Sequence, residues 1–86
     1  AAYERIGRAQ PLFVARWQVG NVLRLLGRTD EALAMQTVLE RDMVAAGAPD
    51  PYVYDELALL QAARGQADAA ALARRRAAEL RDGRRP

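Results

Sequence analysis

The sequence predicts an all-α domain built from antiparallel helix hairpins, and three observations support this prediction. Apolar residues recur every three or four positions along most of the 86-residue chain, and no stretch alternates polar and apolar residues as a strand would. Alanine, the strongest helix former, is abundant. Glycine and proline stand between the apolar stretches, where they end one helix and begin the next.

Two helices are expected before the first turn. Residues 1–10 predict a short flanking helix. Because the residue before a proline disfavours helical dihedrals and proline suits a first helical position, we expect a break at Gln10–Pro11. A second helix follows over residues 11–26, and Gly20 in its middle indicates that another backbone comes close there. Its apolar stripe consists of Leu12, Ala15, Val19, Val22, Leu23 and Leu26. Other sides of this helix are apolar too, so we expect neighbours to cover it on several sides.

The remaining helix ends are marked by local chemistry. Gly27 predicts a left-handed cap, and Thr29 predicts the N-cap of a helix over residues 30–46. Asp50-Pro51 is a capping residue followed by a first-turn proline, and it predicts a helix over residues 51–64. After Gly65, a last helix is expected over residues 67–81. Residues 83–86 are expected to form a flexible tail.

The composition excludes most kinds of active site. The sequence has no Cys, His, Ser or Lys, which removes disulfides, imidazole bases, serine nucleophiles, Schiff bases and nearly every transition-metal site. We therefore expect no catalytic residue, no metal, no cofactor and no enzymatic activity.

Composition also bears on origin and compartment. All 13 basic residues are Arg, a bias typical of GC-rich bacterial genomes, and the net charge is only +2. The chain begins with Ala-Ala, which predicts a piece excised from a longer bacterial protein. No stretch has the length of a membrane span and no signal peptide is visible, so we expect no membrane partner. The expected compartment is the cytoplasm, although the lack of Cys fits the periplasm equally.

The chain contains an internal repeat. Gly27 corresponds to Gly65 at an offset of 38 residues, and the same offset places Gly20 on Ala58 and Ala32 on Ala70. Small residues at matching places on both helices of a hairpin permit close antiparallel packing. A repeat of this length predicts stacked helix pairs.

These residues resemble the tetratricopeptide repeat (TPR). The second copy carries the family pattern at Tyr54, Leu57-Ala58, Gly65, Ala70, Ala77 and Leu80. The first carries it at Val19-Gly20, Leu23, Gly27 and Glu31-Ala32-Leu33 but has Arg16 in place of the leading aromatic residue. The family repeat has about 34 residues, and the extra four here fit one added turn before a longer loop at 47–50. The resemblance implies repeats at 11–48 and 49–82 in a short right-handed α-solenoid of about five helices.

The resemblance further implies a scaffold or adaptor that binds a partner protein or peptide in a concave groove. The groove is lined by the first helix of each pair. The predicted binding residues are Trp17, Gln18, Asn21, Arg24, Tyr52, Asp55 and Glu56, with Val14, Leu25, Leu59 and Ala62 beside them. A clamp for a C-terminal carboxylate, as in one subfamily, is disfavoured because Trp17 and Glu56 replace its Lys and Asn.

Purely structural roles compete with these assignments. Trp17 also fits packing between helices, and Asn21 and Gln18 also fit contacts to solvent or to a neighbouring helix. Asp55 and Glu56 lie near a helix start, where carboxylates are favoured by the helix dipole alone.

Two alternative functions remain at this point. Arrays usually need about three repeats, so either missing repeats complete the stack in the longer protein or identical chains stack through Ile6, Leu12 and Phe13. Nucleic acid could bind along Arg74, Arg81 and Arg85 of the last helix, although a solvated terminal face is the favoured interpretation of these cations and of Arg75 and Arg76.

Overall fold

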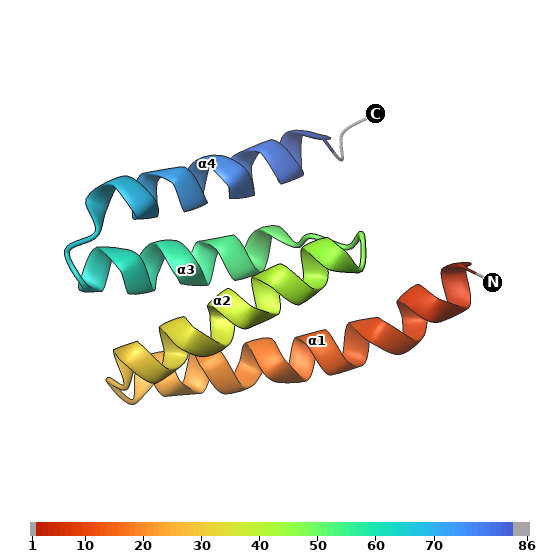
Figure 1. Cartoon of the computed structure of the whole chain (residues 1–86), viewed down its shortest axis with the longest axis horizontal. Coiled ribbons are helices and arrows are strands. Elements are labelled where there is room, and N and C mark those ends of the chain that lie inside the picture. Colours follow the sequence, from red (N-terminus) through yellow and green to blue (C-terminus); the bar gives the residue numbers. More distant parts are fainter. Residues whose placement is uncertain (1, 84–86) are drawn as a thin grey trace.

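Four helices make up the part of the chain that the structure describes. The computed structural model gives the backbone of residues 2–83 and the side chains of residues 12–83. The helices are α1 (Ala2–Leu25), α2 (Thr29–Ala45), α3 (Pro51–Ala63) and α4 (Ala67–Gly83), with no strand over residues 2–83. They lie in the order α1, α2, α3, α4 across the molecule (Figure 1). The all-α prediction is confirmed.

The helix α1 passes through Pro11 without a break. The predicted boundary at Gln10–Pro11 is therefore wrong, as is the count of about five helices. A proline inside a helix removes one backbone hydrogen bond and crowds the carbonyl four residues earlier. Here helix-forming residues on both sides continue the pattern past the single missing donor, and the predicted flanking helix becomes the first part of α1.

The two hairpins turn in the same way. Gly27 and Gly65 have positive φ angles of 79° and 76°, which favour glycine. At the first turn the Arg28 N–H donates to the Leu23 carbonyl at 2.9 Å, and at the second the Gln66 N–H donates to Gln61 at 2.8 Å. The helices after these turns begin at residues 29 and 67 and end at residues 45 and 83. The offset of 38 therefore holds from one end of the helix to the other.

One predicted cap is present and one is absent. The Asp50 carboxylate accepts a hydrogen bond from the Tyr52 N–H at 2.8 Å, so the predicted cap of α3 is confirmed. Thr29 does not cap α2, because the tight turn at Gly27 leaves Thr29 already inside the helix. Arg28 takes the cap position without a side-chain cap bond. The predicted tail begins inside α4, whose last residue is Gly83, and the rest of it lies outside the described residues.

The hydrophobic core lies mainly between α2, α3 and α4. Its buried members are Leu39, Met43, Val53, Tyr54, Leu57, Ala58, Ala73 and Ala77. Among the described side chains of α1, residues 12–25, the half-buried Phe13 and Trp17 pack against this cluster. Between residues 2 and 83, no helix has both the length and the apolar content needed to cross a membrane.

Five of the six residues of the predicted apolar stripe are exposed, whereas Leu23 is half-buried. Leu12, Val19, Val22 and Leu26 are 49–66% exposed, and Ala15 between them is also exposed. We call these five residues the outer face of α1. The other helices of the chain therefore do not cover α1 on several sides as expected, because its other face alone is enough to pack the hairpin.

Gly20 makes room for a side chain rather than for a backbone. Gln36 of α2 is 0% exposed, and its Nε2 donates to the Trp17 carbonyl of α1 at 3.1 Å. A Cβ atom on Gly20 would lie 2.7 Å from Gln36 Cδ, which is closer than such atoms approach. The missing side chain at Gly20 thus lets a buried amide tie the two helices of the first hairpin together.

Replacing Gly20 by Ala is expected to lower the free energy of unfolding by about 1–2 kcal/mol, measured by urea denaturation. Alanine favours helix by about 1 kcal/mol, but the new Cβ displaces the buried Gln36 amide and breaks its hydrogen bond. In a Gln36→Ala background the clash is absent, so the same Gly20→Ala change should instead stabilise the protein. A stabilising effect in both backgrounds would show that Gln36 moves aside without cost.

Candidate interaction site

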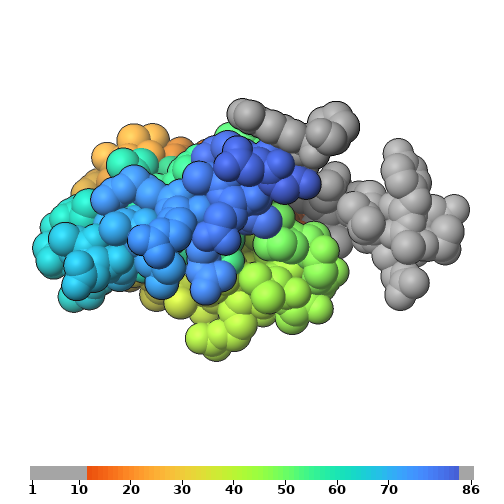
Figure 2. Space-filling model, turned by 90° about the horizontal axis from the view of Figure 1, so that it is seen from above, coloured from red at the N-terminus to blue at the C-terminus, as the bar shows by residue number. Residues whose placement is uncertain are grey.

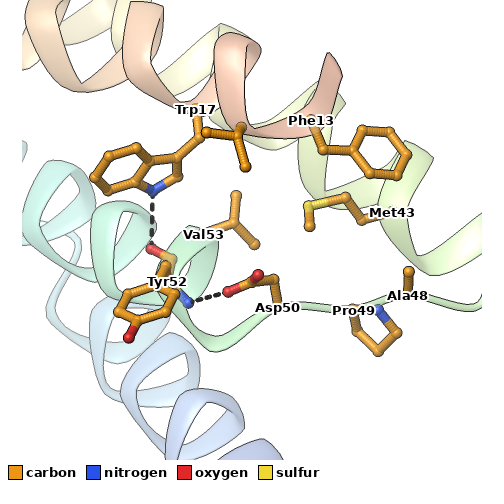
Figure 3. A pocket seen from close by; sticks show the side chains of 9 residues that line it. Phe13, Trp17, Met43, Ala48, Pro49, Asp50, Tyr52 and Val53 are labelled. Atoms are coloured by element: carbon orange, nitrogen blue, oxygen red, sulfur yellow. Dashed lines mark hydrogen bonds between the residues drawn. The ribbon is translucent and has the colours of Figure 1, made fainter. Parts of the chain in front are cut away.

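An apolar pocket of about 550 Å³ opens where α1, the end of α2 and the start of α3 meet. Its lining residues are Phe13, Val14, Trp17, Met43, Ala48, Pro49, Asp50, Tyr52 and Val53. Figure 3 shows Phe13 and Trp17 on one side, Met43 and Val53 at the base, and the 48–50 loop opposite. The volume falls in the range of sites that take a small molecule or a peptide side chain.

Two aromatic residues of the predicted groove meet at this pocket. Trp17 is half-buried against the core, and its indole Nε1 donates to the Tyr52 carbonyl at 3.2 Å (Figure 3). This contact agrees with the packing role that the sequence left open for Trp17. Tyr52 itself is 61% exposed, and the guanidinium of Arg81 lies 5.6 Å from its ring centroid. Arg81 therefore covers one face of the Tyr52 ring, and the rest of the ring stays exposed at the rim of the pocket, where a ligand can contact it.

Three polar residues predicted to bind a partner instead bind one another. The Glu56 carboxylate, only 3% exposed, accepts from Asn21 Nδ2 at 2.7 Å and from Arg24 Nε and Nη2 at 2.8 and 3.0 Å. The hydrogen bond to Glu56 raises the pKa of Arg24, and burial of the guanidinium opposes this change. This cluster joins α1 to α3 and has no free carboxylate for a basic ligand.

Asp55 is also paired within the chain. Both of its carboxylate oxygens accept from Arg81 of α4, one of them at 3.2 Å. This hydrogen bond raises the pKa of Arg81. Asp55 therefore holds α3 to α4, and Arg81, one of the three cations proposed for nucleic acid, is already engaged.

The other predicted groove positions are exposed but do not all face the pocket. Val14 lines it, whereas Gln18 and Leu25 lie on α1 outside its lining. Leu59 and Ala62 are exposed on α3, also outside it. Arg74, Arg75 and Arg76 are exposed on α4, and Arg85 lies outside the described residues.

The sequence did not identify half of the pocket. Met43, Val53 and the 48–50 loop line it, but Met43 and Val53 look like ordinary core residues in the sequence. The available signal was the loop itself, whose extra length and Pro49 predict a rigid segment that projects from the hairpin ends.

The described part of the chain holds no cluster of three or more potential metal ligands among its acidic side chains. Comparison of the chain with family models, with curated proteins and with solved structures found no match.

Proposed function

We propose that this chain is a protein-interaction module of the TPR-like type, part of a longer bacterial protein, that holds an apolar side chain of a partner peptide in the pocket. The observation that supports the proposal is the 550 Å³ apolar pocket beside Trp17 and Tyr52. The repeated hairpins support the TPR-like assignment. In such arrays the first helix of each pair lines the binding groove, and here the corresponding helices, α1 and α3, both line the pocket.

The chemistry of the pocket favours a peptide with an aromatic or aliphatic anchor. The walls are largely apolar, and Trp17 and Tyr52 are residue types that often carry binding energy at interfaces. The two carboxylates of the predicted groove, Asp55 and Glu56, would favour a basic partner, but both are paired with arginines inside the chain. Specificity for a basic partner is therefore not part of the proposal.

Peptides selected from a random phage-displayed library against the whole chain test this proposal. We expect the selected peptides to share one large apolar residue, and the Val14→Glu variant to bind them at least about tenfold more weakly. Val14 lines the pocket and is half-exposed, so a charge there blocks the ligand without disturbing the core.

The matched control is Val38→Glu, which places the same charge at a similarly exposed position of α2 outside the pocket. This variant should bind the peptides with unchanged affinity. Failure to enrich any peptide over an unrelated helical protein, or equal affinity for the Val14→Glu variant, would overturn the proposal.

A further inference from the structure

We infer that copies of this chain stack head to tail, with the outer face of α1 in one copy packed on the α3–α4 hairpin of the next. This contact uses surfaces other than the pocket, so it can hold or fail independently of peptide binding.

The outward side of α1 is almost entirely apolar. Between residues 12 and 26, eight positions of α1 and the following turn are exposed: Leu12, Val14, Ala15, Gln18, Val19, Val22, Leu25 and Leu26. Seven are apolar and none is charged, in a chain whose charged residues are 28% of the total. A contiguous exposed surface of this kind marks an interface.

The internal repeat indicates what covers this surface. At the offset of 38, Ala15, Val19 and Val22 of the outer face correspond to Val53, Leu57 and Leu60 of α3. Those three are buried, and Val53 and Leu57 share a core cluster with Leu39 and Met43 of α2. The outer face of α1 is thus the equivalent of the α3 face that the first hairpin covers.

The equivalent of the covering surface lies at the other end of the chain. Within the chain, the first hairpin contacts α3 through both of its helices. Asn21 and Arg24 of α1 bind Glu56. On α2, Leu33 packs against the core, and Glu40 accepts a hydrogen bond from Tyr54. The offset carries these positions onto Leu59, Ala62, Ala71 and Ala78. All four are exposed, and we call them the tail surface.

Neither surface carries a charge at the position equivalent to the Glu56 contact. Inside the chain, the Glu56 carboxylate meets Arg24 and Asn21. Between copies, the equivalent of Glu56 is the neutral Gln18, and it would meet Leu59 and Ala62 in place of Asn21 and Arg24. The carboxylate and its cation are replaced together, so the proposed contact buries no unpaired charge at this point.

The edge of the tail surface is polar, as the rim of an interface usually is. Asp68, Arg74 and Arg75 lie next to it on α4 and are exposed. Asp55 and Arg81 at its other edge already neutralise each other.

The two surfaces lie at opposite ends of the array. In Figure 1, α1 and α4 are the outermost helices, and Figure 2 looks onto the α4 side of the molecule. One copy can therefore bind two others at once. Because the two surfaces differ, the contact does not close on itself as a symmetric dimer does, and assembly continues beyond two copies.

Sedimentation equilibrium of the whole chain, up to about 1 mM so that millimolar association is detected, tests the inference. We expect the average mass to rise past that of a dimer. Val22→Glu blocks the outer face and Leu59→Glu blocks the tail surface, each at a half-exposed position. Each variant alone should remain monomeric, and their equimolar mixture should form a 1:1 dimer, because each supplies the surface that the other lacks.

The matched control Val38→Glu, on neither surface, should assemble like the unchanged chain, and circular dichroism checks that all variants stay helical. A monomer at the highest concentration would overturn the inference. So would a Leu59→Glu variant that still dimerises, since this would mean a symmetric contact between two α1 helices. Loss of assembly in the Val38→Glu variant would also overturn it.

Discussion

Replacing Arg24 by Ala is expected to lower the free energy of unfolding by about 3 kcal/mol, because it leaves the buried Glu56 carboxylate without its cation. Both oxygens of Glu56 accept from Arg24, and the carboxylate is almost fully shielded from water. The Arg24 side chain is 28% exposed, so the expected loss of stability lies at the lower end of the losses seen when a buried ion pair is broken. Urea denaturation followed by circular dichroism measures the change.

Two further variants show whether the cost comes from the unpaired charge. Adding Glu56→Gln to Arg24→Ala should recover at least about 1 kcal/mol, because the amide is neutral and can still accept from Asn21. Arg16→Ala breaks a comparable pair, to Asp42, near the surface and should cost less than about 1 kcal/mol. The carboxylate is not effectively buried if the double variant loses as much free energy of unfolding as the Arg24→Ala and Glu56→Gln variants lose together. The same conclusion follows if Arg16→Ala lowers the free energy of unfolding as much as Arg24→Ala does.

Local chemistry explains which parts of the fold could be predicted from the sequence. The turns at Gly27 and Gly65 and the start of α3 at Asp50-Pro51 depend on dihedral preferences and on one side chain that caps its own helix. Such signals act over a few residues and can be found in a single sequence. The signal at Pro11 failed because a missing donor weakens a helix without ending it when both flanks remain helical.

The candidate site was harder to predict because it depends on how the helices cross. The sequence places Asn21, Arg24 and Glu56 on groove helices, but only the approach of α1 to α3 shows that they satisfy one another. In the same way, the spacing of Val19 and Val22 indicates an apolar face without saying whether a neighbour covers it. Contacts between residues that lie more than 30 positions apart in the sequence become visible only in the tertiary structure.

Raising the pH from about 8 to about 12 is expected to remove about 2–3 kcal/mol of stability through Tyr54. Its side chain lies in the core at 5% exposure, and its hydroxyl donates to Glu40 Oε2 at 2.6 Å. Burial and this hydrogen bond raise the pKa of Tyr54 from 10.0 to about 12, although nearby Arg76 opposes the change. The folded chain therefore keeps the proton while the unfolded chain loses it, so the contribution is complete below pH 10 and disappears between pH 10 and about 12.

Urea denaturation of the unchanged chain and of Tyr54→Phe at both pH values isolates this contribution. At about pH 8, Tyr54→Phe should be less stable by about 1 kcal/mol, because the hydrogen bond to Glu40 is lost. At about pH 12 the unchanged chain has lost its advantage, so the order of stability should reverse. Tyr52→Phe removes an exposed phenol from a neighbouring position and should follow the unchanged chain across the whole range. A constant difference between the unchanged chain and Tyr54→Phe would mean that the folded core admits the phenolate, and hence that water reaches Tyr54 between α2 and α3.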